Sequence, residues 1–511
     1  MGLSRRLWTL LLVLLLSGCG EVSPPPSQSP APAATPTPTP QPVEFALGYD
    51  SGDDLHPFRG NSRLNLEWMP LVYRGLYRLD NTFVPQPELA AGATVDDSGQ
   101  VWTVELARAF FSDGTRLTGD VVAASLLAAR SSPVYGTRLQ DVAAVEPTPD
   151  NGGVLITLSR PNGVLPTLLD VPIVLERAEG LPLGTGPYVC AEGEMVLYPN
   201  LLWWGEQTPT CRRIPLRDIP SPDRHIAAFD SGEIAAVSTD LTGAGALGYS
   251  GTYETHDYPT TQMLYVGFQT ADGRPCAQPE LRLALSRAMD RSSVLTSMLS
   301  GHGTAATLPL SPLHPDYDAE LAATLDYDIA AARQLLAGLG YTAGEDGILR
   351  RGRNRLSLTL VVNNDSATRM AIADYLAGSF RELGVDIQVQ MLAWADYQQA
   401  LRSGAFDLFL GEVRLTGDFD IQPLVTGELN CGSYTSRAVA DGLEKLRPVA
   451  DDILRRSLRQ ELFGLLAEEL PFAPLCFKNH SLLLRWGMLS GVEPTRGDLL
   501  GDPARWQMLE P

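Results

Sequence analysis

The spacing of hydrophobic and polar positions changes along the chain and predicts two kinds of element. Alternating positions, or short apolar runs bounded by turn residues, predict strands over 43–49, 101–106, 154–158, 213–219, 234–240 and 260–269. Apolar residues three and four positions apart predict helices over 66–77, 118–130, 224–231, 279–300 and 328–338. The first two thirds of the chain therefore mix strands and helices.

The most regular unit lies in the second half of the chain. A strand over 356–362, a helix over 367–383 and a strand over 385–392 follow one another with short connections. A strand at 406–410, an amphipathic helix at 451–469 and a strand at 472–477 continue the pattern. Because crossover helices join parallel strands, this part is expected to form an α/β lobe.

Residues 183–204, LGTGPYVCAEGEMVLYPNLLWW, predict a tight turn followed by two short strands. In the turn Gly184 and Gly186 tolerate unusual φ, and Pro187 fixes the exit of the chain. The stretch resembles the GTGPY…N-x-x-Y-W signature of the family 5 extracellular solute-binding proteins, the peptide- and nickel-binding components of ABC importers. Asn200 and Trp204 match it, while Trp203 stands where that family has tyrosine.

Three further strings resemble the same family in the same order. They are VYRGLYRLD at 72–80, FSDGTRLTGDV at 111–121 and LRLALSRAMDRSSV at 281–294. In the second string Thr118 is expected to be the N-cap of a helix, with Asp120 in its first turn. The resemblance extends from about residue 44 to residue 492.

The resemblance implies an α/β fold of the bilobal periplasmic-binding-protein type (type II), with two α/β lobes, a hinge between them and an inserted extra domain. Domain I, the first lobe, is expected to comprise 43–60, 181–268 and 472–511. Domain II, inserted in the first lobe, is expected at 61–180, and domain III, the second lobe, at 269–471. Hinges are expected near 267–270 and 471–474.

The amino-terminal segment predicts export. Arg5 and Arg6 precede the apolar run 7–16, which is too short to span a bilayer and suits a signal peptide over 1–18. Leu16-Ser17-Gly18-Cys19 resembles a bacterial lipobox, which implies a lipid on Cys19 and attachment to the outside of the bacterial cell membrane. An uncleaved anchor, or a secreted chain with a chance cysteine, is the alternative. The Pro/Ser/Thr-rich linker within 19–42 is expected to be extended.

Composition narrows the function. The 511 residues fit two or three domains, and 44% apolar and 19% charged residues are typical of globular chains. A net charge of −21 argues against nucleic acid as a partner, because phosphates require clustered Lys and Arg. The sequence has no CxxC, HExxH, GxSxG or P-loop motif, so we expect no metal, no cofactor and no enzymatic activity.

With Cys19 lipidated, five cysteines remain, and an odd number leaves at least one thiol unpaired. Cys190 and Cys211 flank the same group of short strands. They either form a disulfide with each other or remain two buried free thiols.

The strongest candidate for ligand binding is the segment 412–420, which follows the strand at 406–410. The resemblance implies that Asp418 pairs with the amino terminus of a ligand, with Asp420 as a substitute. Alternatively these acids cap a turn or face solvent. Arg414 could bind a ligand carboxylate or pair with Glu412. The family's carboxylate-binding arginine sits earlier, where this chain has Leu410, which argues against a free peptide.

Further candidates lie where strands end, the usual ligand position in open α/β sheets. These are Tyr49, Asp50, Asp240, Gln269 and Asn363. Asn363 could equally cap the helix that follows it. Trp394 and Tyr397 form either an apolar wall of the site or ordinary core.

The resemblance implies the solute-binding component of an ABC importer, which closes two lobes on a small solute, dipeptide- or oligopeptide-like, and delivers it to permease subunits. We expect a monomer. The alternative is an extracellular sensor or structural lipoprotein with this fold; binding of a nickel chelate, or a surface hydrolase, has less support.

Overall fold

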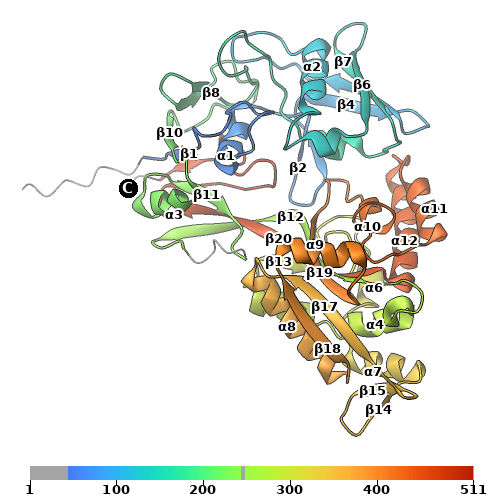
Figure 1. The fold of residues 1–511 in the computed structure, drawn as a ribbon. Coiled ribbons are helices and arrows are strands. Elements are labelled where there is room, and N and C mark those ends of the chain that lie inside the picture. Colours follow the sequence, from blue (N-terminus) through green and yellow to red (C-terminus); the bar gives the residue numbers. More distant parts are fainter. Residues whose placement is uncertain (1–43, 206, 243–247, 510–511) are drawn as a thin grey trace, which may run out of the picture. The chain divides into compact units, whose positions relative to one another are not determined.

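The structure is a computed structural model, and it describes residues 44–509 apart from residue 206 and residues 243–247 (Figure 1). The expected signal peptide, the lipidated Cys19 and the linker lie outside these residues and stay predictions. Within the described part of the chain, no helix combines the length and the apolar character needed to cross a bilayer.

Two long antiparallel strands, β12 (Tyr253–Phe268) and β20 (Phe472–Arg485), connect the two halves of the largest sheet. This seven-stranded sheet has the order β11-β20-β12-β19-β17-β18, with β13 also paired to β20. β11 (Ala236–Thr239) pairs with one end of β20, and β19 (Leu408–Arg414) pairs with the opposite end of β12. A register shift between Pro259 and Met263 separates the two ends. We call β12 and β20 the crossing strands.

The second lobe contains the predicted strand–helix–strand unit. β17 (Ser357–Asn363) and β18 (Asp386–Leu392) are parallel, and α8 (Ala367–Glu382) joins them and packs against both (Figure 1). β19 is parallel to β17, as expected for an α/β lobe. Other elements here are β13 (Gly303–Ala305), α6 (Ala319–Ala323), α7 (Ile329–Gly338), β14 (Thr342–Ala343), β15 (Leu349–Arg351), β16 (Asn354–Arg355), α9 (Trp394–Ser403), α10 (Gln422–Val425), α11 (Arg437–Leu446) and α12 (Asp452–Glu469).

The single helix expected over 279–300 is wrong, because the chain breaks it into α4 (Pro279–Arg287), α5 (Arg291–Ser293) and a π turn (Val294–Met298). The cause is Asp290. Its carboxylate accepts a hydrogen bond from the Ser293 backbone N–H at 3.0 Å and so caps a new helix.

The first lobe has a four-stranded sheet with the order β1-β10-β9-β8. The strands are β1 (Leu47–Tyr49), β10 (Ile214–Asp218), β9 (Val196–Pro199) and β8 (Tyr188–Ala191). α1 (Arg63–Val72) packs against β1, β8 and β11, and α3 (Pro222–Ser231) packs against β11. The helix expected over 66–77 thus begins earlier and ends at Val72. The chain closes with the short pair β21 (Leu489–Ser490) and β22 (Gln507–Met508).

The GTGP turn needs glycine for space. A Cβ on Gly184 would lie 1.9 Å from the Val72 carbonyl oxygen, and neither Gly184 nor Gly186 has a positive φ. The expectation that unusual φ explains these glycines is therefore wrong. The Asn200 side chain donates to the Gly186 carbonyl at 2.8 Å, and the Trp204 indole N–H donates to the Thr185 carbonyl at 3.0 Å. The signature residues therefore fasten this turn against the end of α1.

The inserted segment forms an antiparallel sheet of order β4-β5-β7-β6. The strands are β4 (Ala90–Val95), β5 (Val101–Leu106), β7 (Gly153–Leu158) and β6 (Val142–Pro147), and α2 (Gly119–Ala129) packs against β6 and β7. Thr118 is the N-cap residue as expected, but its side chain makes no capping bond. Asn151 replaces it, accepting from the Asp120 backbone N–H at 2.9 Å and donating to the Asp120 carboxylate at 2.6 Å.

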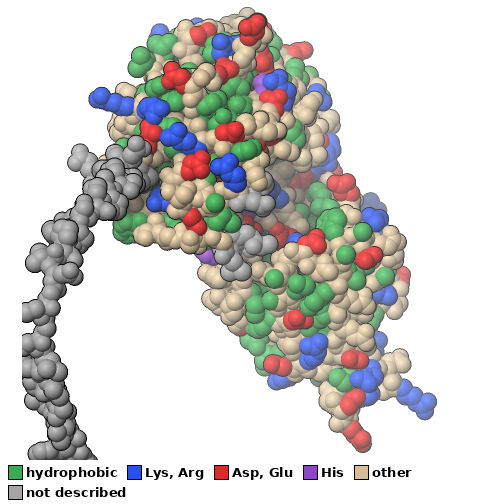
Figure 2. Space-filling model, turned by 60° about the vertical axis from the view of Figure 1, so that its left-hand side comes forward, with side chains coloured by type: hydrophobic (Ala, Val, Ile, Leu, Met, Phe, Trp, Pro, Cys, Tyr) green, Lys and Arg blue, Asp and Glu red, His purple; other side chains and the backbone are tan. Residues whose placement is uncertain are grey.

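The hydrophobic core of this sheet is continuous with that of the first lobe. The expected domain boundaries stay a prediction. On the face shown in Figure 2, acidic and basic side chains are interspersed among apolar ones. All five cysteines in the described residues are free thiols in the structure. Cys211 is buried, whereas Cys190 is half-buried.

Candidate functional site

The predicted ligand-binding residues do not form one cluster. Asp418 and Asp420 lie in the loop after β19. Glu412 and Arg414 belong to β19 itself, so the expectation of a loop over 412–420 is wrong for its first three residues. β19 is longer than its apolar core because it pairs with β12 up to Arg414.

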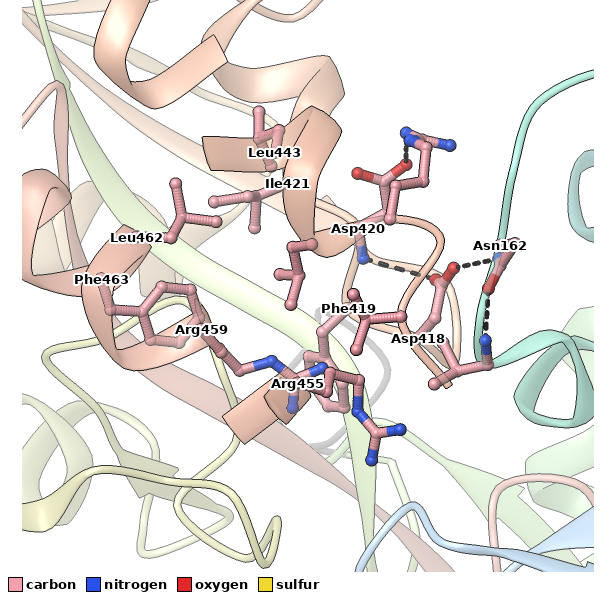
Figure 3. A pocket seen from close by; sticks show the side chains of 14 residues that line it. Asn162, Asp418, Phe419, Asp420, Ile421, Leu443, Arg455, Arg459, Leu462 and Phe463 are labelled. Carbon is pink, nitrogen blue, oxygen red and sulfur yellow. Dashed lines mark hydrogen bonds and ion pairs between the residues drawn. The ribbon is translucent and has the colours of Figure 1, made fainter. Parts of the chain in front are cut away.

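The Asp418 carboxylate is occupied by protein donors. It accepts hydrogen bonds from the Asn162 amide at 3.0 Å and the Asp420 backbone N–H at 3.4 Å (Figure 3). It also accepts one from the Thr416 hydroxyl at 2.5 Å. Burial, and then the neighbouring Asp420 charge, raise the pKa of Asp418, and its hydrogen bonds only partly offset this rise. Asp418 thus joins the second lobe to the inserted segment.

Further contacts strengthen that joint. Asp420 forms an ion pair with Arg447 at 2.8 Å, and the Gly163 backbone N–H donates to the Arg447 carbonyl at 2.7 Å. A Cβ on Gly163 would lie 2.3 Å from the Val449 carbonyl oxygen. The two backbones are therefore in direct contact, and there is no room for a solute between them.

Phe83 completes this joint from the hairpin of β2 (Tyr77–Leu79) and β3 (Pro85–Pro87). Its ring meets Phe419 edge to face, with centroids 5.0 Å apart, and packs within the core of the second lobe. Phe83 has φ 64° and Phe419 has φ 55°, which is rare for bulky residues. We call Phe83, Asn162 and Gly163 with Asp418, Phe419 and Arg447 the interdomain joint.

A cavity of about 670 Å³ lies beside this joint. Three arginines and three aspartates line it, so the formal charges balance. Asp316 binds Arg459 at 2.7 Å and Arg456 at 3.0 Å. The charged groups of this cavity thus largely satisfy one another.

A second cavity, of about 210 Å³, surrounds Lys478. The Lys478 ammonium is 2.6 Å from an Asp240 oxygen and 3.8 Å from Glu412. Burial raises the pKa of Asp240, but the hydrogen bond and charge of Lys478 outweigh that effect and lower it overall. Arg369 lies 3.7 Å from Glu412 and donates to the Asn363 side chain at 3.2 Å. Two predicted residues, Asp240 and Glu412, thus line this Lys478 cavity, and a third, Asn363, is bonded to its Arg369.

A third cavity, of about 370 Å³, contains Arg414. Its lining comes from α1, from the segment around residue 138, from the carboxy-terminal segment 496–499, from both crossing strands and from β19. The Arg414 side chain is exposed, and no ion pair connects it to any of the described residues. Since β19 belongs to the second lobe and α1 to the first, this Arg414 cavity lies between elements of both lobes.

Three more arginines, Arg63, Arg138 and Arg496, face the same cavity. The Asp170 carboxylate forms an ion pair with Arg138 at 2.8 Å and accepts a hydrogen bond from Arg496 at 3.1 Å. Burial lowers the pKa of Arg496 to about 10, although the Asp170 charge opposes that effect. The single negative charge of Asp170 is therefore shared by two arginines, and one positive charge remains.

Glu67, on α1, is the other acid of the cavity. Burial raises its pKa to about 7, partly offset by Arg63, whose guanidinium is 3.7 Å away, and by a hydrogen bond from the Ser238 backbone N–H at 3.0 Å. Arg63 in turn donates to the Ser238 hydroxyl at 2.7 Å.

Gln262 connects the Arg414 cavity with the Lys478 cavity. Its amide nitrogen donates to Glu412, and its amide oxygen lies 3.2 Å from Nε2 of His480. Burial lowers the pKa of His480 to about 4, so this ring is neutral at physiological pH. A continuous polar path therefore runs along the crossing strands.

The other predicted residues lie elsewhere, and none lines these three cavities. Trp394 is exposed and stacks on Tyr397, with centroids 5.9 Å apart, whereas Tyr397 is buried and donates to the Leu410 carbonyl at 2.9 Å. Gln269 is buried and accepts from the Ala271 backbone N–H. Asp50, next to Tyr49 at the end of β1, accepts from the Gly52 backbone N–H and so forms a turn.

Sequence reasoning missed six charged residues and one asparagine that shape these places. They are Arg63, Glu67, Asn162, Arg138, Arg369, Arg496 and Lys478. Only Lys478 had a visible signal, because it is a single charge within an apolar strand. The others come from distant helices and loops that only the tertiary fold brings together.

Comparison with known proteins agrees with this architecture. The sequence profile described as "Bacterial extracellular solute-binding proteins, family 5 Middle" matches residues 84–424. The chain belongs to this family. Solute-binding proteins of family 5 are extracytoplasmic. The fold of this chain is the bilobal type II periplasmic-binding-protein fold.

Individual relatives are distant. The chain is 23% identical to the oligopeptide-binding protein AppA of Bacillus subtilis over 447 residues, covering 81% of this chain and 82% of AppA. It is 24% identical to the glutathione-binding protein GsiB of Salmonella choleraesuis over 455 residues, covering 82% and 86%. The crystal structure of NikZ from Campylobacter jejuni with Ni(L-His) superposes with TM-score 0.62 at 20% identity, covering 91% of this chain and 98% of NikZ.

Proposed function

We propose that this chain is the solute-binding component of an ABC importer and that it captures a small peptide-like solute in the Arg414 cavity. Family membership supports the transport role. Both lobes line this cavity and the cavity of about 670 Å³, but the charged groups of the larger one largely satisfy one another. The observation that carries the choice of site is that Arg414, beside the crossing strands, has no ion pair with any of the described residues. A solute that contacts both lobes stabilises their closed arrangement, because only that arrangement makes all the contacts.

The relatives support a ligand built from amino acids. Their names or titles refer to an oligopeptide, glutathione and a Ni(L-His) complex. About 370 Å³ falls in the range of roughly 300–1,000 Å³ typical of small-molecule pockets. Within the described residues no group of three or more His, Cys, Asp or Glu side chains is placed to hold a metal ion directly. A short peptide therefore has the strongest support.

The roles of the predicted residues divide accordingly. Arg414 is proposed to bind the solute, while Asp240, Glu412 and Asn363 hold the polar path beside it. For Asp418 we propose a structural role in place of pairing with a ligand ammonium, because its oxygens already accept protein hydrogen bonds. We propose the same structural role for Asp420, which forms an ion pair with Arg447.

We also propose a domain organisation and a membrane attachment for the chain. The domain boundaries are those given above, with the inserted segment packed on the first lobe. Lipidation of Cys19 would tether the chain to the outside of the membrane beside the permease subunits.

A thermal-shift screen tests the proposed function. The purified chain is heated with dipeptides, oligopeptides, opines and nickel chelates, and a bound solute is expected to raise the melting temperature by mass action. Mass spectrometry of solute retained through a native purification is the second readout. Absence of binding in both would contradict the transport role and favour the alternative, an extracellular sensor or structural lipoprotein.

A further inference from the structure

The Arg414 cavity has the opposite charge balance from the protein as a whole. The chain carries 60 acidic and 39 basic residues, yet four arginines and only two acids face this cavity. In the Lys478 cavity acids outnumber bases by three to two, and in the cavity beside Asp418 the numbers are equal. Positive charge is therefore concentrated in one of the three places.

The two acids of the Arg414 cavity leave this excess in place. Asp170 is shared by Arg138 and Arg496. Glu67 is 3.7 Å from Arg63, a long contact for an ion pair, and burial disfavours its charged form. Arg414 has no acidic partner among the described residues. Arg414 and Arg63 therefore keep guanidinium donors available for a solute.

The arginines of the cavity also come from elements of both lobes. Arg414 stands at the end of β19, in the second lobe, whereas Arg63 lies on α1 in the first. Arg414 is close enough to Arg496 to contribute to lowering its pKa. Like charges that face each other across a cavity oppose its closure, and an anion between them removes that opposition.

From this arrangement we propose that the solute carries at least two carboxylates, as an acidic dipeptide does, and that it bridges Arg414 of the second lobe and Arg63 of the first. This inference rests on the proposed function and specifies its ligand. Guanidinium groups bind carboxylates through two parallel hydrogen bonds, so each end of the bridge also fixes the orientation of the solute. The anion thus acts as the counter-charge that allows the lobes to approach.

Titration calorimetry on the full chain at fixed ionic strength tests this inference, with three dipeptides as probes. Asp-Glu carries the acidic side chains, Asn-Gln has nearly the same shape without them, and Lys-Lys has the opposite charge. We expect Asp-Glu to bind about 10- to 100-fold more tightly than Asn-Gln, since a hydrogen bond to a charged group contributes roughly 1.5–3 kcal/mol. Lys-Lys should not bind.

Variants assign the effect to the cavity. Arg414→Ala should weaken Asp-Glu binding by about 10- to 100-fold, and Arg414→Lys, which keeps the charge but loses the paired donors, should weaken it less. Arg402→Ala, which removes another exposed arginine of the second lobe outside the cavity, is the matched control and should leave binding unchanged.

Two results would overturn the inference. The first is binding of Asn-Gln or Lys-Lys as tight as that of Asp-Glu, which would keep the proposed function and remove only the acidic ligand. The second is an equal loss in Arg402→Ala and Arg414→Ala. If no dipeptide binds and no peptide in the thermal-shift screen raises the melting temperature, the proposed function of the cavity fails, and this inference fails with it.

Discussion

Asp418 and Arg414 are four positions apart in the chain, but their surroundings are opposite. At Asp418 the protein supplies three hydrogen-bond donors to the carboxylate, and the adjacent backbones touch. At Arg414 none of the described residues supplies a carboxylate, and a cavity of about 370 Å³ adjoins the guanidinium. A polar group with all its bonds made inside the protein stabilises the fold, whereas a charged group left without a partner beside a cavity is available to a solute.

The interdomain joint and the Arg414 cavity should therefore respond differently to mutation. Changes at the joint should lower stability, whereas loss of Arg414 at the cavity should alter binding while stability is retained, and Glu67 should affect stability only through its pKa. Four predictions test this difference.

Phe83→Ala should have the largest effect on stability. Removal of a buried aromatic ring leaves a cavity and costs about 3–5 kcal/mol of unfolding free energy, measured by urea denaturation. Leu201→Ala is a suitable control because Leu201 is 91% exposed, and it should change the unfolding free energy by less than about 0.5 kcal/mol. Equal stabilities of the two variants would show that the joint does not contribute to the fold.

Asn162→Ala should cost about 1–3 kcal/mol, because it leaves the half-buried Asp418 carboxylate without one of its donors. The Asn162 side-chain oxygen also accepts from the Val164 backbone N–H. Asn162→Asp keeps an acceptor there but not the donor to Asp418, so it separates the two contributions. If Asn162→Asp is as stable as the unchanged chain at neutral pH, the hydrogen bond to Asp418 does not contribute to the free energy of unfolding.

Glu67→Gln should change how stability depends on pH. Because the folded pKa is about 7, above the ordinary value of 4.5, the folded state binds more protons than the unfolded state between these values. Stability contributed by this group is thus present below about pH 4.5 and is lost as the pH rises toward 7.

The glutamine variant should therefore gain in melting temperature relative to the unchanged chain between pH 5 and pH 8. The groups that interact with Glu67 are Arg63, Tyr249 and Tyr258. Burial raises the pKa of Tyr249 and of Tyr258 above the ordinary value of 10, and nearby His480 is already neutral between pH 5 and pH 8. Parallel melting profiles of the two chains would contradict the raised pKa.

Arg414→Ala should have the smallest effect on stability, within about 0.5 kcal/mol, since an exposed side chain without an ion pair contributes little. Urea denaturation of the solute-free chain measures this. A loss of more than about 1 kcal/mol would show that Arg414 supports the fold, and the contrast with Asp418 would disappear.

Local patterns predicted most of the fold but little of the site. The unit β17–α8–β18 was predicted within one or two residues, because apolar spacing and short connections determine it locally. The GTGP turn was found, but its reason, the closeness of Val72, depends on tertiary packing. The Arg414 cavity could not be predicted, because Arg63, Arg138, Arg414 and Arg496 meet only after the chain has folded.

The hairpin that carries Phe83 has a consequence for kinetics. Any movement that separates this hairpin from Phe419 must bring the buried ring into water, at a cost of about 1.5–3 kcal/mol. That cost alone favours the docked arrangement by roughly 10- to 140-fold, before any solute is bound. On the proposed function, a release that required this separation would be slow in solution, and contact with the permease would have to supply the free energy that frees the ring.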